Sequence, residues 1–194
     1  NALTFEEVSK RLQSLALPRE AQTLPLVAAL KNGDFDKAKK ELETLQEQME
    51  SSELSEEERE ELAKALEALA KQLEQLASAN ESLSSALSAA GLNGALASNP
   101  EAAKKAIENA SELSEEQKKK LLELLEAQQT ASKMCEKMAE GCKKCAQGDG
   151  AQAMASELEK MEAMQMFLTD AEIAKMACQS ACMGMCPGEG TTGG

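Results

Sequence analysis

The sequence predicts an all-α protein, a multi-helix bundle whose C-terminal part is a three-helix, cysteine-cross-linked hairpin. The 194-residue chain is dominated by Ala, Leu, Glu, Lys and Gln, which are strong helix formers, whereas Val and Ile are rare. Residue pairs with the spacing of helix-capping motifs recur along the chain. Hydrophobic residues make up 42% of the sequence but include only three Phe, so we expect a thin core made of Ala and Leu seams.

The N-terminal part is expected to contain three helices. Thr4 and Glu7 have capping-box spacing, which predicts that the first helix begins there. A short helix over residues 26–31 should end at Gly33, because glycine readily takes the left-handed conformation of a C-cap. A third helix, capped by Asp34, should then run to about residue 50.

The junction between the second and third of these helices covers residues 26–38, read Leu-Val-Ala-Ala-Leu-Lys-Asn-Gly-Asp-Phe-Asp-Lys-Ala. It resembles the helix-turn-helix junction of a tetratricopeptide repeat and spans about half of such a unit. No second copy occurs in the sequence, so we interpret the stretch as a single helical hairpin.

A heptad-like leucine seam follows a second capping box at Ser55 and Glu58. One interpretation is an extended helix that pairs with a partner strand, with Asn80 setting the register. The other is a core seam inside one bundle with a break near Asn80, because Ser and Asn are poor residues within a helix. We favour the core seam. Its members are Leu62, Leu66, Leu69, Leu73, Leu76, Asn80, Leu83 and Leu87.

Residues 91–94 should form a turn, and Asn99 followed by proline should start a short helix that ends near residue 110. Ser114 and Gln117 are placed to open a long helix over residues 115–146.

The remaining segment is expected to form two more helices. A turn at residues 148–150 precedes a helix over residues 151–167. Thr169 and Glu172 form another capping-box pair, which predicts a break near Leu168 and a return helix to about residue 184.

The six cysteines lie on the long helix and on this return helix, with sequence offsets of 43, 40 and 41 residues between their members. Nearly constant offsets fit two parallel, cross-linked helices. We therefore expect three disulfides in an oxidising compartment, although six cysteines allow 15 connectivities. The simplest pairs are Cys135–Cys178, Cys142–Cys182 and Cys145–Cys186.

A second interpretation of the cysteines is a Cu(I) site, because thiolate and thioether sulfurs suit soft metals and nine of the ten Met lie in the same third of the chain. The spacing Cys178-x-x-x-Cys182-x-x-x-Cys186 resembles that of the Cys-lined bundle helices of bacterial copper-storage proteins. In this alternative the ligands are Cys135, Cys142, Cys145, Cys178, Cys182, Cys186, Met138 and Met183, and copper is the cofactor. In the disulfide interpretation there is no cofactor.

Charge and composition argue against several functions. The net charge of −13 and the lack of a basic cluster disfavour nucleic-acid binding. No apolar run approaches the roughly 20 residues of a membrane span. The chain has no His, and no motif marks a nucleophile or a phosphate loop, so we predict no catalytic residues and no enzyme activity.

These observations predict an N-terminal helical region over residues 1–92, a Cys- and Met-rich helical region over 93–186 and a flexible Gly-rich tail over 187–194. The expected function is that of a non-catalytic structural or protein-interaction module that binds a protein partner or itself through helices. We expect it to be disulfide-stabilised, extracytoplasmic (periplasmic or secreted) and part of a longer or processed protein. The alternative function is Cu(I) binding or storage.

Overall fold

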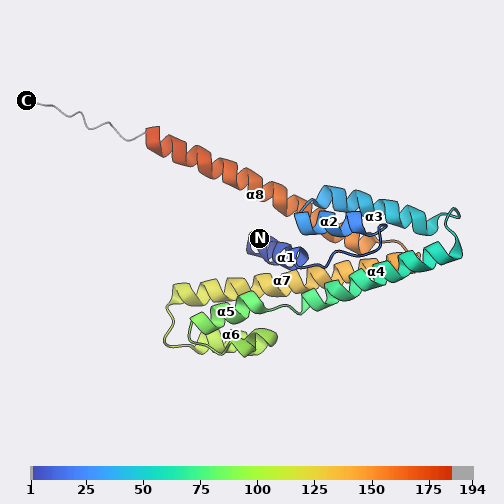
Figure 1. Cartoon of the computed structure of the whole chain (residues 1–194). Helices are drawn as coiled ribbons and strands as arrows, with labels where there is room; N and C mark the ends of the chain where they lie inside the picture. The colour runs from blue at the N-terminus through green and yellow to red at the C-terminus, as the bar shows by residue number, and fades with distance from the viewer. Residues whose placement is uncertain (1, 185–194) are drawn as a thin grey trace, which may run out of the picture.

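The computed structural model describes the chain from Ala2 to Gly184, and the side chains from Ala2 to Leu168. Every regular element in the described range is a helix, which confirms the all-α prediction (Figure 1). No helix of the described part has both the length and the apolar composition that a membrane span requires. The elements are α1 (Ala2–Gln13), α2 (Leu24–Asn32), α3 (Phe35–Glu50), α4 (Glu56–Ala77), α5 (Glu81–Ala89), η1 (Gly94–Ser98), α6 (Pro100–Asn109), α7 (Glu115–Ala146) and α8 (Gln152–Gly184).

Several helix starts lie where the capping chemistry predicts them. At the start of α4, the backbone N–H of Glu58 donates to Ser55 Oγ over 3.2 Å, and the N–H of Ser55 donates to the Glu58 carboxylate over 2.8 Å. Ser114 makes the same reciprocal box at the start of α7. Asp34 accepts a hydrogen bond from the N–H of Lys37, and so caps α3. These bonds satisfy amide groups that the first helical turn leaves without partners.

The predicted start of the first helix was wrong by two residues, because α1 begins at Ala2. Thr4 therefore lies inside the helix and is buried, as is Glu7. Burial of Thr4, Glu7 and Val8 holds this end in helical form without the expected capping box.

Helices α4 and α7 run antiparallel and form the centre of the bundle (Figure 1). The leucine seam is part of this core: six of its seven leucines are buried and Leu76 is half-buried. The α-helix stops at Ala77, and Asn80 occupies the N-cap position of α5. The favoured interpretation of a core seam with a break is confirmed, and the seam is not an open surface for a partner strand.

The apolar core has two parts. The larger cluster runs in sequence from Val8 to Met161 and draws on α1–α4, α7 and α8. The smaller cluster runs from Leu83 to Leu125 and joins α5, η1, α6 and the first turns of α7. Both clusters contain residues from before and after Leu92. The boundary predicted at residue 92 therefore does not separate one apolar cluster from the other.

A buried arginine ties three helices together. Arg11 on α1 is 4% exposed. Its guanidinium donates to the carbonyl of Ala79 over 2.6 Å, at the break between α4 and α5, and to Ser132 Oγ of α7 over 3.4 Å. Arginine suits this position because its planar group can donate in several directions at once.

The C-terminal hairpin differs from the prediction. Helix α8 is continuous from Gln152 to Gly184, so there is no break at Leu168 and no return helix beginning at Thr169. The capping-box pair is overridden because helix formation is cooperative and the flanking residues are good helix formers. The end of α8 extends past α2 and α3 and away from α7 (Figure 1).

A single glycine sets the distance between α7 and α8. A Cβ atom added to Gly141 would lie 2.4 Å from the backbone nitrogen of Met154, which is closer than real Cβ contacts come. The two helices can approach this closely only because Gly141 has no side chain.

Replacing Gly141 with alanine should therefore lower stability, although Gly→Ala within a helix ordinarily raises it by about 0.5–1 kcal/mol. We expect a loss of about 1–3 kcal/mol in the free energy of unfolding, because α7 and α8 must move apart. Denaturant unfolding followed by circular dichroism measures the change. The exposed neighbour Glu140, replaced by alanine, is the control and should shift stability by less than about 0.5 kcal/mol. A stabilised Gly141→Ala variant would contradict this helix packing.

Candidate functional site

The first cysteine cluster lies inside the protein. Cys135, Cys142 and Cys145 are all on α7, all buried, and all free thiols. Cys142 lies against α8, where its thiol donates to the Met154 sulfur over 3.2 Å. This contact sits next to Gly141, whose missing side chain leaves room for the backbone of Met154. The thiols thus serve here as small core side chains.

Burial makes these thiols poor nucleophiles. It raises the pKa of Cys135 to about 11, an effect that the nearby Arg11 guanidinium partly opposes. Burial and the carboxylate of Glu50 together raise the pKa of Cys145 to about 11. Burial also raises the pKa of Cys142, well above the ordinary range. Because the thiolate is the reactive and metal-binding form, these groups stay protonated and unreactive at neutral pH.

The second cysteine cluster is not brought beside the first. Cys178 and Cys182 lie on the continuous α8, with side chains outside the described set, and Cys186 lies outside the described residues. Without a return helix, Cys178 is about 22 Å farther along the hairpin axis from the turn than Cys135. No described cysteine forms a disulfide. The predicted intrachain disulfides required a return helix beside α7, whereas α8 is continuous.

The copper alternative receives no direct support from the described side chains. Among them, no three His, Cys, Asp or Glu groups converge in a way that could hold a metal ion. Met138 is buried on α7, whereas the side chain of Met183 lies outside the described set. The soft-metal site stays a prediction.

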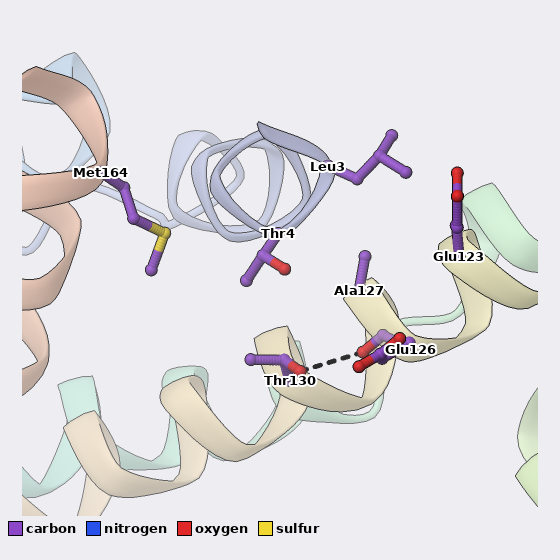
Figure 2. Close-up of a pocket in the computed structure, with 7 residues that line it drawn as sticks. All are labelled: Leu3, Thr4, Glu123, Glu126, Ala127, Thr130 and Met164. Atoms are coloured by element: carbon purple, nitrogen blue, oxygen red, sulfur yellow. Dashed lines mark hydrogen bonds between the residues drawn. The ribbon is translucent and has the colours of Figure 1, made fainter. Parts of the chain in front are cut away.

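A groove on the surface joins α1, α7 and α8 (Figure 2). Its volume is about 500 Å³. In Figure 2 the side chain of Met164 reaches from α8 toward α1, where Thr4 lies, and Ala127 and Thr130 line the groove from α7. The full lining is Leu3, Thr4, Glu123, Glu126, Ala127, Thr130 and Met164.

The groove has a partly acidic and partly apolar lining. Apolar side chains and the carboxylates of Glu123 and Glu126 share the lining, which holds no cation or thiol. The Thr130 hydroxyl is engaged, since it donates to the backbone carbonyl of Glu126 over 3.0 Å (Figure 2).

An exposed apolar segment begins at the edge of this groove. Met166 and Phe167 on α8 are 63% and 65% exposed, more than any other large apolar side chain that the structure describes. Half-buried Met164 and Leu168 flank them and, with Phe167, line a second small hollow. We call residues 164–168 the α8 apolar segment. Sequence reasoning missed it because the predicted break at Leu168 placed these residues at the end of a packed helix.

A comparison with protein-family models, curated proteins and solved structures finds no match to this chain.

The buried thiols should resist alkylation. We expect iodoacetamide to modify Cys135, Cys142 and Cys145 at least about 100-fold more slowly in the native protein than in the denatured chain at neutral pH, because raised pKa values and burial both suppress the thiolate. Mass spectrometry of peptides after timed quenching measures each site. Modification of all three sites at similar rates in the native and denatured protein would contradict their placement in the core.

Proposed function

We propose that this chain is a non-catalytic protein-interaction module that presents α8 as a docking helix. The observation that carries the proposal is the exposure of Met166 and Phe167, consecutive residues of α8 that follow its buried residue Met161. Single exposed apolar residues are ordinary, but a contiguous apolar patch on a surface is typical of an interaction site.

The different surroundings of the three Phe side chains support this function. Phe5 and Phe35 pack edge-to-face in the bundle, with ring centroids 6.1 Å apart. Phe167 is the third Phe of the chain and projects into solvent instead. Full burial of such a side chain contributes about 1.5–3 kcal/mol, so a partner that covers Phe167 would gain substantial binding free energy. Aromatic residues and Met are enriched in the centres of protein interfaces.

The first half of α8 provides a rigid base for docking. Met154, Leu158 and Met161 are fully buried in the larger core cluster. Glu157 is also buried, and it pairs with Lys160 over 2.7 Å and with Lys137 of α7 over 3.8 Å. These contacts anchor the helix, so binding need not order a flexible segment. A preorganised surface loses less conformational entropy when a partner binds.

An intrachain disulfide is not part of this proposal, because the continuous α8 separates the two cysteine clusters along the helix axis. The extracytoplasmic location was inferred from those disulfides and stays a prediction. The acidic surface, with a net charge of −13, favours partners that are neutral or basic around the contact.

Site-specific photo-crosslinking in cells tests the proposal. A photoreactive amino acid is placed at Phe167 and, as the control, at Glu67, an exposed position on α4. We expect a discrete protein adduct from position 167, because the α8 apolar segment is covered by a partner, and none of comparable yield from position 67. Mass spectrometry identifies the adduct.

Competition supplies the second half of this test. An excess of the unlabelled wild-type chain should reduce the adduct, whereas an excess of the unlabelled Phe167→Glu variant should not. The absence of any discrete adduct at position 167, or an equal yield at both positions, would contradict an interaction through this segment.

A further inference from the structure

We propose that the partner docked on α8 contributes a basic amphipathic helix, which lies in the groove between α1, α7 and α8. This inference rests on the proposed function and names the chemistry of the partner. It is carried by two exposed carboxylates of α7, Glu123 and Glu126, which line the groove together with Met164 of the α8 apolar segment (Figure 2). Neither carboxylate is paired with a cation in the part of the chain that the structure describes.

The groove and the α8 apolar segment are continuous. Met164 lines the groove and also lines the small hollow that Phe167 and Leu168 share. Met164 is half-buried and packs against the larger core cluster, so the core holds the junction of the two hollows in place. Leu3, which is 38% exposed, adds an apolar side chain to the groove from α1. A partner that covers Phe167 therefore lies next to the groove.

The chain itself does not compensate the two carboxylates of the groove. Glu123 and Glu126 are three residues apart on α7, a spacing at which like charges are neighbours on the helix surface and destabilise it. Earlier on the same helix, Glu115 pairs with Lys118 over 3.5 Å. Lys119 lines a neighbouring hollow together with both glutamates of the groove but pairs with neither. Cationic side chains of a partner would supply the missing positive charges.

The dimensions of the groove favour a helix over an extended peptide. The α7 residues of its lining run from Glu123 to Thr130, which is about 10 Å, or two helical turns. A bound helix places its anchors at intervals of three, four and seven residues, and these intervals match a groove of this length. An extended peptide would gain most from an unpaired strand edge, and the described part of the chain contains no strand.

The net charge of the chain favours a basic partner over a second copy. With a formal net charge of −13, the chain attracts cationic partners and repels anionic ones as they approach. A second copy carries the same excess of negative charge, so self-association across this groove is disfavoured. In the proposed complex, apolar residues of the bound helix cover Met164 and Phe167, while its Lys or Arg side chains reach the two glutamates. Charge and apolar area are then complementary over the same surface.

Fluorescence anisotropy of a labelled model peptide is the first test. The probe is a helical peptide of about 18 residues, or five turns, with a stripe of Leu flanked by Lys. The comparison peptide has the same Leu stripe flanked by Glu. We expect the full chain to bind the Lys peptide at least about tenfold more tightly than the Glu peptide. Equal affinities for the two peptides would overturn the proposal.

Matched charge variants locate the contact. Glu123→Gln combined with Glu126→Gln should weaken binding of the Lys peptide by about three- to tenfold at low salt, because two exposed ion pairs are lost. The control combines Glu57→Gln with Glu61→Gln on α4, which removes the same charge from exposed positions outside the groove. It should change the dissociation constant by less than about twofold. Equal losses from the two double variants would indicate a general attraction to an acidic protein and overturn the groove as the binding site.

Phe167→Ala tests the apolar half of the contact. It should weaken binding of the Lys peptide at least about fivefold, because the peptide loses an aromatic side chain that it covers. Leu17→Ala is the control: Leu17 is 58% exposed but lines neither the groove nor the small hollow beside it. This control should change the dissociation constant by less than about twofold. Equal effects of Phe167→Ala and Leu17→Ala would contradict binding along this surface.

The protein captured by photo-crosslinking at position 167 distinguishes a wrong partner class from a wrong docking surface. If position 167 captures a protein but the Lys peptide is not preferred, the docking function stands and the basic helix is wrong. If the chain alone forms a dimer in sedimentation equilibrium that Phe167→Ala dissociates, the occupant is a second copy and the basic helix is again wrong. Preference for the Lys peptide that depends on both glutamates and on Phe167 supports the inference.

Discussion

The structure depends on α7, which is surrounded on most of its circumference and packs against α1, α4, α6 and α8. A helix in this position needs apolar residues on several faces, and it needs small residues wherever a neighbouring helix comes close. Gly141 meets the second requirement most directly, because α8 occupies the space that a Cβ would need. Helix α4, which packs most extensively against α7, and the other helices of the larger core cluster complete the bundle around it.

This constraint explains the first cysteine cluster without a chemical function. Cys142 lies one residue from Gly141 and contacts Met154 across the narrow interface, where a compact thiol fits and a leucine would be larger. Burial places Cys135, Cys142 and Cys145 in the core. The same burial raises the pKa values of their thiols, and so suppresses their reactivity. The two cysteine clusters therefore need not share one role, and similar spacing in the sequence does not establish that they are close in space.

Local chemistry made the helix starts at Ser55, Ser114 and Asp34 predictable, because a capping side chain bonds only to its own first turn. The same local motif failed at Thr169, where the flanking residues favour continuation of α8 and the cooperative helix overrides a possible cap. The break at Asn80 could be predicted for a related reason, since Ser and Asn both weaken the helix there.

Arg11 could not be identified from the sequence, because its partners at Ala79 and Ser132 are brought to it only by the tertiary packing. The α8 apolar segment was missed because its exposure depends on the direction in which α8 leaves the bundle.

The central claim is that α8 continues as one helix through Leu168, since the proposed docking segment requires it. The direct measurement is the distance between spin labels at Gln152 and Gln179, obtained by double electron–electron resonance. Cys178, Cys182 and Cys186 are replaced by serine for this purpose, and the labelled chain is diluted with unlabelled chain to remove distances between copies. A continuous helix predicts about 40 Å between the labelled positions along the axis. A distance of about 15 Å, as a return helix beginning at Thr169 would give, would contradict the account.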